Sequence, residues 1–164
     1  MSAFRIILAD DHLMFRQGLK KILEDLGLSA ALRWMLKEFT KVYHIDVAFD
    51  DTVEIDHLFS RKAQIILYRI FQEALTNIGK HAQATRISIA IKEEADKISF
   101  LVEDDGKGFD LGRITRKDVT EKGIGLVTMN ERVRMLGGSF HLMSQEVGGT
   151  RIDFTILPDG GNAE

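Results

Sequence analysis

The sequence predicts an α/β fold, in which amphipathic helices and short alternating strands share one core. The segment Ser60–Ala82 places its apolar residues at intervals of three and four, as a helix with one buried stripe does. Residues Thr85–Ile91 and Lys97–Val102 alternate apolar and polar side chains, and the polar sequence KEEAD between them predicts a hairpin turn. The chain of 164 residues, 45% apolar and 29% charged, has the composition of a globular domain.

The composition also excludes several classes of protein. The net charge of -3 shows no basic excess, so we expect no nucleic-acid partner. The chain has no cysteine, which rules out disulfides, thiolate metal sites and thiol nucleophiles. No segment approaches the roughly 20 apolar residues that span a bilayer. We therefore expect a cytoplasmic protein, with no membrane segment in this chain.

The first residues predict a separate strand–helix unit. Phe4–Ala9 is a short apolar strand, Asp10, Asp11 and His12 close it, and residues 14–27 form a helix with Asp11 as N-cap. This opening resembles the start of a response-regulator receiver domain, where such acids help to hold Mg²⁺ beside a phosphorylatable aspartate. The later strand with that aspartate is missing, so incidental acids are the preferred interpretation.

We expect two units in the chain. Residues 1–24 would be the receiver-like fragment and residues 25–164 the main domain, joined naturally or as a chimera. The fragment's strand could add to a sheet edge or pair a homodimer. In the main domain the periodicity predicts, in order, a helix over 25–44, a strand over 45–49, an acidic connection over 50–56, the helix over 60–82, the hairpin, a polar loop over 113–122, a helix from 123 that ends at Gly137 and Gly138, and strands over 140–143 and 151–157.

Four short segments of the main domain stand in a characteristic order. They are Glu73, Asn77, Lys80 and His81 on the central helix, then Asp104-Asp105-Gly106-Lys107-Gly108-Phe109, then Gly123-Ile124-Gly125-Leu126, then Gly148-Gly149-Thr150. This set resembles the ATP-binding domain shared by gyrase, the heat-shock chaperone ATPases, histidine kinases and the mismatch-repair ATPase. Its flanks resemble sensor histidine kinases of the nitrate-sensor type. The resemblance covers residues 25–158 and implies a two-layer α/β sandwich of the Bergerat type, with a mixed sheet, helices on one face, and ATP and Mg²⁺ as ligands.

The resemblance assigns roles around the purine and the metal. Asp104 matches the acid that accepts a hydrogen bond from the adenine amine, while Gly106 and Gly108 allow the backbone to approach the base; the alternative is a simple tight turn. Asn77 matches the residue that ligates Mg²⁺ through its side-chain oxygen. Glu73 matches a general base or water-orienting acid, and an ordinary helix-surface salt bridge is an equal alternative.

Further assignments concern the phosphates and the rim of the site. Lys80 and His81 match positions near the phosphates, although a histidine at a helix end often caps carbonyls. Gly123 and Gly125, followed by Leu126, would present backbone N–H groups to phosphate oxygens, and residues 110–122 would form a lid ordered by nucleotide. Thr150 matches a residue that bonds near the adenine, or else simply starts a strand. Asp105 is expected to be a solvated turn residue, and Gly79 to loosen the turn that carries Lys80 at a cost of roughly 1 kcal/mol.

The sequence therefore predicts the Mg-ATP-binding catalytic domain of a two-component sensor histidine kinase. No segment resembles the dimerisation helix with its phosphoacceptor histidine, so this domain and a response regulator are expected partners. The isolated chain is expected to show little or no turnover. Two alternatives stay open, namely a serine/threonine kinase of the anti-sigma type and a non-enzymatic scaffold that retains the fold.

Overall fold

A computed structural model describes residues 13–113 and 123–159 of the chain. Its sheet has five strands in the order β1-β2-β3-β5-β4. β1 pairs with β2 in parallel, and the other neighbouring strands are antiparallel. The strand bounds are β1 Asp46–Asp50, β2 Arg86–Glu94, β3 Lys97–Asp104, β4 Ser139–Ser144 and β5 Thr150–Ile156.

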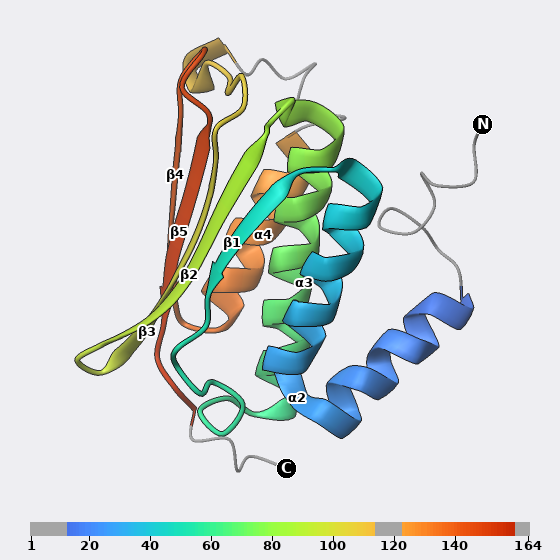
Figure 1. Cartoon of the computed structure of the whole chain (residues 1–164). Helices are drawn as coiled ribbons and strands as arrows, with labels where there is room; N and C mark the ends of the chain where they lie inside the picture. The colour runs from blue at the N-terminus through green and yellow to red at the C-terminus, as the bar shows by residue number, and fades with distance from the viewer. Residues whose placement is uncertain (1–12, 114–122, 160–164) are drawn as a thin grey trace.

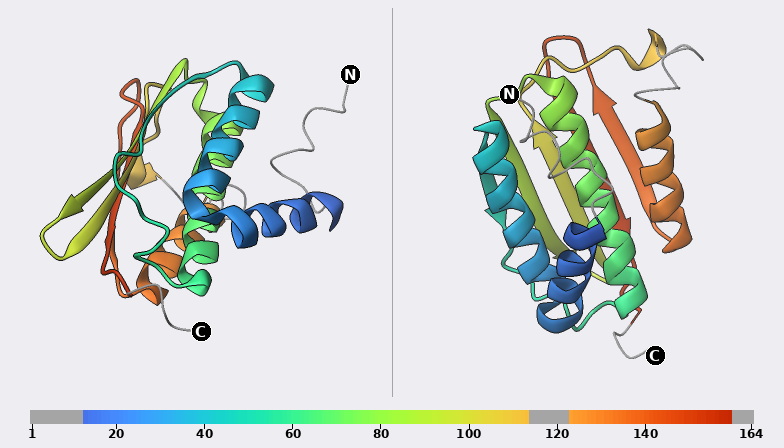
Figure 2. Two further views of the ribbon diagram at one scale, coloured as in Figure 1. Left: turned by 60° about the horizontal axis from the view of Figure 1, so that its bottom comes forward. Right: turned by 90° about the vertical axis from the view of Figure 1, so that its right-hand side faces the viewer.

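The helices cover one face of this sheet, which confirms the predicted two-layer sandwich (Figures 1 and 2). They are α2 Leu13–Tyr43, α3 Arg61–Asn77 with a π-helical continuation η2 Ile78–Ala82, the short 3₁₀ turn η3 Leu111–Arg113, and α4 Gly123–Met135. The buried positions alternate along β2, β3 and β5, because one side of each strand faces the helices and the other faces solvent.

A cluster of aromatic rings joins the two layers. Phe100 of β3 stacks on Phe154 of β5 with ring centroids 4.8 Å apart, and Phe71 of α3 meets both rings edge-on at 6.0 Å. All three side chains are at most 1% exposed. This packing fixes α3 over the middle of the sheet, and it therefore fixes where the C-terminal residues of α3 lie relative to the sheet.

Helix α2 combines the two helices that the periodicity predicts, because they meet at a break at Gly27. Gly27 has φ 85°, a left-handed conformation that glycine adopts without steric cost. A Cβ there would lie 2.7 Å from the carboxyl carbon of Asp56, and that carboxylate accepts a hydrogen bond from the Ser29 backbone N–H at 2.9 Å. Asp56 therefore stabilises the start of the second helical section.

The start of α3 is tied to the other end of the domain. The Ser60 hydroxyl accepts a hydrogen bond from the Ala63 backbone N–H, as an N-cap does. The Asp159 carboxylate in turn accepts hydrogen bonds from the Ser60 backbone N–H at 2.5 Å and from its hydroxyl at 2.6 Å. The segment after β5 thus helps to hold the helix that carries Glu73 and Asn77.

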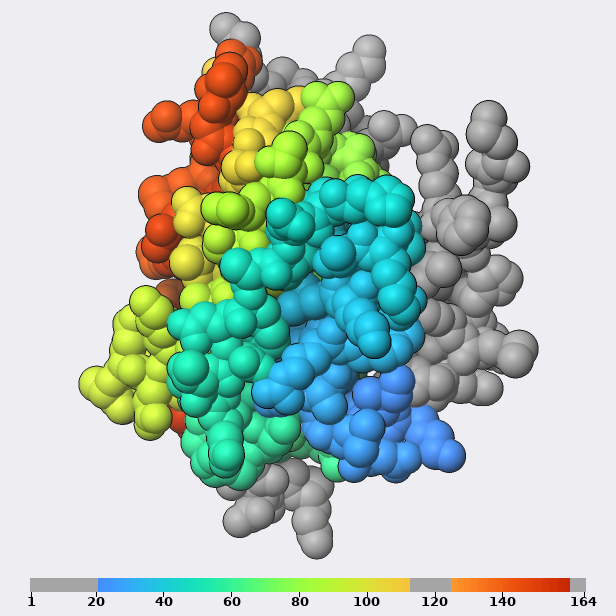
Figure 3. Space-filling view, in the orientation of Figure 1, coloured from blue at the N-terminus to red at the C-terminus, as the bar shows by residue number. Residues whose placement is uncertain are grey.

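The β2–β3 hairpin is longer and tighter than the sequence predicts. Glu94 pairs with Lys97, so only Ala95 and Asp96 form the turn, whereas the prediction assigned all of KEEAD to it. The strand extends beyond the core because Lys92, Glu93 and Glu94 are exposed there, and exposed polar side chains carry no desolvation penalty. Figure 3 shows the hairpin projecting from the body of the molecule.

Some predictions fall outside the described residues. The strand over 4–9, with Asp10, Asp11 and His12, and most of the proposed lid, residues 114–122, belong to this group. The receiver-like unit, the domain boundary and the homodimer therefore stay predictions. Among the helices of the described residues, none has both the length and the apolar character needed to cross a bilayer.

Candidate functional site

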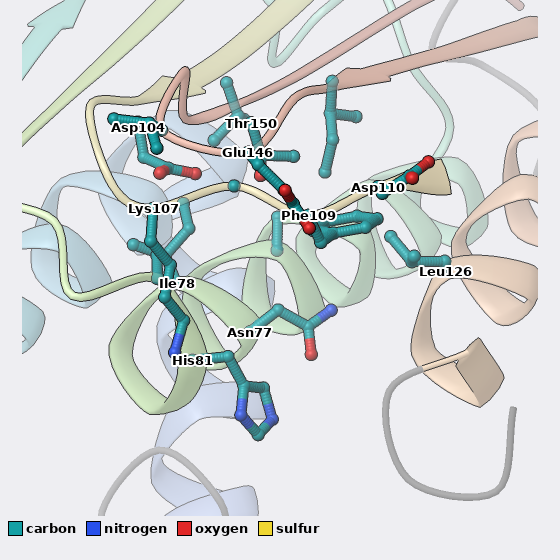
Figure 4. Close-up of a pocket in the computed structure, with 16 residues that line it drawn as sticks. Asn77, Ile78, His81, Asp104, Lys107, Phe109, Asp110, Leu126, Glu146 and Thr150 are labelled. Carbon is teal, nitrogen blue, oxygen red and sulfur yellow. The ribbon is translucent and has the colours of Figure 1, made fainter. Parts of the chain in front are cut away.

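A cavity of about 530 Å³ opens where the end of α3 faces the end of β3 (Figure 4). Helix α3 and η2 form one wall, the loop after β3 forms another, and the β4–β5 turn and the start of α4 complete it. The described residues that line it are Ala74, Asn77, Ile78, His81, Ala82, Val102, Asp104, Lys107, Gly108, Phe109, Asp110, Leu126, Glu146, Val147, Thr150 and Ile152. Most of this lining is apolar, with a few polar groups, as in small-molecule sites.

Asp104 supplies a buried carboxylate to this cavity. It is the last residue of β3 and only 4% exposed, and one carboxylate oxygen accepts a hydrogen bond from the Gly106 backbone N–H at 2.8 Å. Burial raises the pKa of the Asp104 carboxyl above its usual value, although backbone hydrogen bonds from Gly106 and Thr150 oppose that rise. An acceptor in this position suits a ligand that brings a hydrogen-bond donor.

Its neighbour Asp105 faces the other way and has a structural role. Its carboxylate accepts hydrogen bonds from the backbone N–H groups of Thr85 and Arg86, at 2.8 and 2.9 Å, and from the Thr85 hydroxyl at 2.6 Å. The Thr85 hydroxyl bond and these backbone bonds lower the pKa of the Asp105 carboxyl. Asp105 is exposed, as expected of a turn residue, but it also holds the start of β2.

The loop after β3 is bonded on both of its sides. The Lys107 backbone N–H donates to the Ala82 carbonyl at 2.8 Å, and the Lys107 carbonyl accepts from the Val147 N–H at 2.7 Å. A Cβ at Gly106 would lie 2.3 Å from the Ala82 carbonyl oxygen, so only glycine permits this approach. The loop therefore joins the end of the central helix to the β4–β5 turn.

Gly108 and Gly149 are required at the turn side of the same loop. Gly108 has φ 57° and a Cβ there would lie 2.0 Å from the Gln145 carbonyl oxygen. Gly149 has φ 73° and its Cβ would lie 2.0 Å from the Asp104 carbonyl oxygen. Gly108, which was predicted to let the backbone approach a base, thus lets two backbone segments approach one another, and Gly149 does the same. This packing shapes the wall of the cavity.

Thr150 lies beside Asp104 in the sheet. The two residues are paired across β3 and β5, and Thr150 lines the cavity. Its hydroxyl is 3.1 Å from the Ser144 hydroxyl, which also accepts a hydrogen bond from the Phe109 N–H at 2.9 Å. Thr150 therefore begins a strand, which was the alternative offered for it, and it also lines the cavity.

Asn77 enters the cavity from the last turn of α3 (Figure 4). Its amide nitrogen is buried and has no hydrogen-bond partner within residues 13–113 and 123–159. Rotation of the amide exchanges its nitrogen and oxygen, so either atom can be offered at this point. An unsatisfied carboxamide fits a site that lends one neutral oxygen ligand to Mg²⁺, whose other ligands are water and phosphate oxygens. In the described part of the chain no group of three or more histidine, aspartate and glutamate side chains could hold an ion unaided.

Glu73 lies one turn before Asn77 but does not line the cavity. Its carboxylate packs against the start of α4, where a Cβ on Gly125 would lie 2.1 Å from Oε1 of Glu73 and 3.2 Å from Nδ2 of Asn77. Within the described residues Glu73 forms no ion pair, so the salt-bridge alternative gains no support. Gly125 is therefore needed for contact between α4 and α3. Gly123 begins α4 and Leu126 of the same first turn lines the cavity.

The two basic residues at the end of the central helix lie in the same turn but take different positions relative to the cavity. Residues Ile78–Ala82 are π-helical, and His81 lines the cavity while Lys80 is exposed and does not. A Cβ at Gly79 would lie 2.5 Å from the Tyr43 ring. The prediction that Gly79 loosens this turn is therefore incomplete, since its lack of a side chain makes room for that ring.

Sequence reasoning missed several lining residues, among them Lys107, Glu146 and Val147. Lys107 lies inside the predicted Asp104–Phe109 motif, but only the glycines on either side of it were given a role. Val147 has φ 66°, an uncommon conformation for a β-branched residue, and nothing in its own identity signals such a turn. Its place in the same cavity as Asp104 depends on the antiparallel pairing of β5 with β3, which a linear motif does not encode.

Residues 62–160 match the family described as the histidine kinase-, DNA gyrase B- and HSP90-like ATPases. The chain belongs to this family. The match covers the central helix, the loop after β3, α4 and the β4–β5 turn, which together form the cavity. ATP binding follows from membership of this ATPase family.

Three relatives of this ATPase domain are sensor kinases. The chain is 36% identical over 134 residues to the signal transduction histidine-protein kinase/phosphatase DegS of Brevibacillus brevis, covering 82% of this chain and 33% of that protein. It is 34% identical to the oxygen sensor histidine kinase NreB of Staphylococcus carnosus, with coverage of 82% and 37%. It is 32% identical to the kinase/phosphatase UhpB of Salmonella typhimurium, with coverage of 82% and 25%. The chain thus spans about a third of these relatives or less.

Solved structures share the fold of the domain. The histidine kinase domain of the blue-light activated histidine kinase EL346 from Erythrobacter litoralis has a TM-score of 0.64 at 20% identity, covering 80% of this chain and 61% of that one. The histidine kinase AdeS of Acinetobacter baumannii has a TM-score of 0.58 at 12% identity, with coverage of 90% and 78%. The sensor-kinase relatives and this fold support an ATP-binding catalytic domain of two-component histidine kinases.

Proposed function

We propose that this domain binds Mg-ATP in the cavity between α3 and β3 and transfers the γ-phosphoryl group to a histidine on a partner domain. The observation that carries the proposal is that Asp104 and Asn77, the predicted purine and metal residues, line one cavity from facing elements. A carboxylate that accepts from the adenine amine fixes the base, and the phosphates then extend toward the helix end.

The metal site in this proposal is Asn77, which would lend its carboxamide oxygen to Mg²⁺. When bound, the ion would offset charge on the phosphates. Lining residues Val102, Ile78 and Ile152 offer an apolar surface for the purine face, and Leu126 contributes to the same lining. The domain thus binds and orients the nucleotide, and its apolar walls exclude water from it.

Glu73 is the proposed general base or orienting acid. Its carboxylate lies against the start of α4 and beside Asn77. In this role Glu73 needs to reach the acceptor histidine of the partner domain, and not the purine. In the transfer the γ-phosphorus–oxygen bond breaks and a bond from a histidine ring nitrogen forms, while ADP leaves and the ring proton passes to a base. Such transfer uses in-line geometry, so the acceptor must approach from the open side of the cavity.

The acceptor histidine is proposed to lie on another domain. The relatives are named as histidine kinases, and this chain matches about a third of their length or less. A dimerisation domain with the acceptor histidine and a response regulator are therefore the proposed partners in the parent system, and a cytoplasmic location follows for an ATP-dependent domain of this kind.

Calorimetric titration with ATP and ADP, with and without Mg²⁺, tests the binding step. We expect the wild-type domain to bind ATP and Asp104→Asn to bind about 30- to 100-fold more weakly, since a charge-assisted hydrogen bond contributes roughly 2–3 kcal/mol. Asn77→Ala should remove most of the Mg²⁺ dependence and leave adenosine binding intact. No heat from ATP with the wild-type domain would contradict the proposal.

Labelled ATP tests the transfer step. The chain is incubated with the separately purified dimerisation domain of a sensor-kinase relative, and the phosphorylated product is tested for acid lability. A histidine phosphate is lost in acid, whereas a serine or threonine phosphate survives. Acid-stable label would instead favour the anti-sigma type of kinase, and binding without any transfer would favour the scaffold alternative.

A further inference from the structure

The Ser144 hydroxyl joins three segments at the wall of the cavity. It accepts a hydrogen bond from the Phe109 backbone N–H at 2.9 Å, donates to the Gly149 carbonyl at 3.0 Å, and lies 3.1 Å from the Thr150 hydroxyl. Phe109 and Thr150 line the cavity, whereas Ser144 is not among the described residues that do. An effect of Ser144 on a ligand therefore has to pass through a neighbour such as Thr150.

These contacts determine which hydroxyl donates in the Ser144–Thr150 pair. A serine hydroxyl has one proton and two lone pairs. A carbonyl oxygen can only accept, so the bond to Gly149 uses the Ser144 proton, and the bond from the Phe109 N–H uses one lone pair. The contact with Thr150 is then a hydrogen bond only if Thr150 donates to the second lone pair. The Thr150 hydroxyl thus gives its proton to Ser144 and keeps its own lone pairs for other donors.

Thr150 and Asp104 are neighbours on the sheet side of the cavity. They are paired across β5 and β3, and both line the cavity (Figure 4). An ionised carboxylate can only accept hydrogen bonds, and a hydroxyl whose proton is already engaged can likewise only accept. Two neighbouring acceptors favour a ligand that brings an amino group. They disfavour one that brings a carbonyl oxygen, because no proton is then available between the oxygen atoms.

We propose that Ser144 is a specificity-determining positioning residue, which holds the Thr150 hydroxyl as an acceptor and so makes the cavity select purines with a 6-amino group over purines with a 6-oxo group. This inference rests on the proposed function and deepens it, since it concerns the base of the same nucleotide. Without the Ser144 hydroxyl, the Thr150 hydroxyl can turn and donate its proton to a 6-oxo group. Adenine and hypoxanthine differ in this group, so a comparison of the two bases detects the change.

Dissociation constants for ATP and inosine triphosphate (ITP), both with Mg²⁺, test the inference by competition against a fluorescent ATP analogue. Both nucleotides carry the same triphosphate, so the ratio of the two constants cancels the phosphates and the metal. We expect the wild type to prefer ATP by about 100-fold or more. Ser144→Ala should lower this preference about three- to tenfold, chiefly through tighter ITP binding, because one neutral hydrogen bond becomes possible. Ser144→Thr keeps a hydroxyl and should keep the preference within about twofold of the wild type.

Ser139→Ala is the matched control. Ser139 and Thr155 form a second serine–threonine pair at the other end of the same two strands, with their hydroxyls 2.7 Å apart, and neither is among the described residues that line the cavity. This variant should leave the preference for ATP unchanged. Thr150→Val removes the hydroxyl through which Ser144 is proposed to act. Adding Ser144→Ala to Thr150→Val should therefore change the preference no further.

The possible results separate this inference from the function on which it rests. A wild-type domain that does not bind ATP contradicts the proposed function. A wild-type domain that binds ATP, with the preference unchanged in Ser144→Ala, overturns the inference alone.

Three other results also overturn it. Equal losses for ATP and ITP in Ser144→Ala would show a purely structural role, and the same shift in Ser139→Ala would show that the site is not specific. A shift that persists in the Thr150→Val background would show that Ser144 does not act through Thr150. Circular dichroism melts identify any variant that is unfolded. If Ser144→Ala is unfolded, Ser144→Cys decides in its place, because a thiol is similar in size but a weak hydrogen-bonding group.

Discussion

Two adjacent carboxylates at the end of β3 face opposite environments. Asp104 is buried and directed to the cavity, and burial raises its pKa. Asp105 is exposed and accepts three hydrogen bonds that hold the start of β2, and these bonds lower its pKa. One acid is kept available for a ligand at a cost to the unliganded domain, and its neighbour stabilises the loop that presents it.

Gly106→Ala is expected to disrupt both regions and to have the largest effect on stability. A Cβ would lie 2.3 Å from the Ala82 carbonyl oxygen and 2.7 Å from the Asp104 carboxylate, so backbone has to move. We expect a loss of about 3 kcal/mol in the free energy of unfolding, measured by denaturant titration. Gly137→Ala is the control, because its φ is 70° but nothing lies within 4 Å of the added methyl group. It should lose about 1 kcal/mol, and equal losses for the two variants would contradict the steric argument.

Asp105→Ala is expected to affect stability without affecting the ligand. Removing three hydrogen bonds at the start of β2 should lower the free energy of unfolding by about 1–2 kcal/mol. The dissociation constant for ATP should stay within about twofold of the wild type at a temperature where both are folded. Glu93→Ala, at an exposed position of the same strand β2, should be neutral. A large loss of affinity in Asp105→Ala would show that the two sides of the loop are not independent.

Asp104→Asn is expected to raise the stability of the unliganded domain, whereas Asp105→Ala lowers it. The neutral amide keeps an oxygen that can accept from Gly106 but does not require a buried charge. We expect the unliganded variant to gain about 1 kcal/mol in stability at pH 7 while it loses ATP affinity. Thermal melts with and without nucleotide measure both effects. A variant that is less stable without ligand would show that the Asp104 charge is structural.

The pH dependence of stability should distinguish Asp104 from Asp105. This is the smallest of the four expected effects. The folded-state pKa of Asp104 is raised, so the folded protein binds more protons near that pKa and the cost of its charge disappears as pH falls through it. The advantage of Asp104→Asn over the wild type should therefore vanish in mild acid. The folded-state pKa of Asp105 is lowered, so its stabilisation is complete above the unfolded value of 3.8 and is lost only as pH falls through the folded value. Urea titrations between pH 7 and 3 measure both, and matching pH profiles for the two variants would contradict the comparison.

The sequence predicted most of the elements because periodicity reports which face of each is buried. The central helix, predicted over Ser60–Ala82, has Ser60 as its N-cap and continues to Ala82. The same reasoning did not predict that the last turn of the helix is π-helical, or that Gly79 in this turn lies against the ring of Tyr43, a residue far away in the chain. It also stopped β3 at Val102, two residues early, since it read the polar end of a strand as a turn.

The candidate site was predicted in part for a similar reason. Motif residues such as Asn77, Asp104 and Thr150 are named by their order in the chain, and the fold brings all three to one cavity. Glu146 and Val147 reach the cavity only through the pairing of β4, β5 and β3, and they carry no motif of their own. The sequence therefore did not predict the residues that reach the cavity through strand pairing, because they belong to no local pattern.

The ring of Tyr43 occupies the space beside Gly79, at the point where α2 ends and the wall of the cavity begins. A displacement of the second section of α2, which follows the break at Gly27, would carry this ring with it and press on the backbone just before His81. The end of α2 and the end of the helix that bears Asn77 are therefore in direct steric contact, and a side chain added at Gly79 would push the two helices apart.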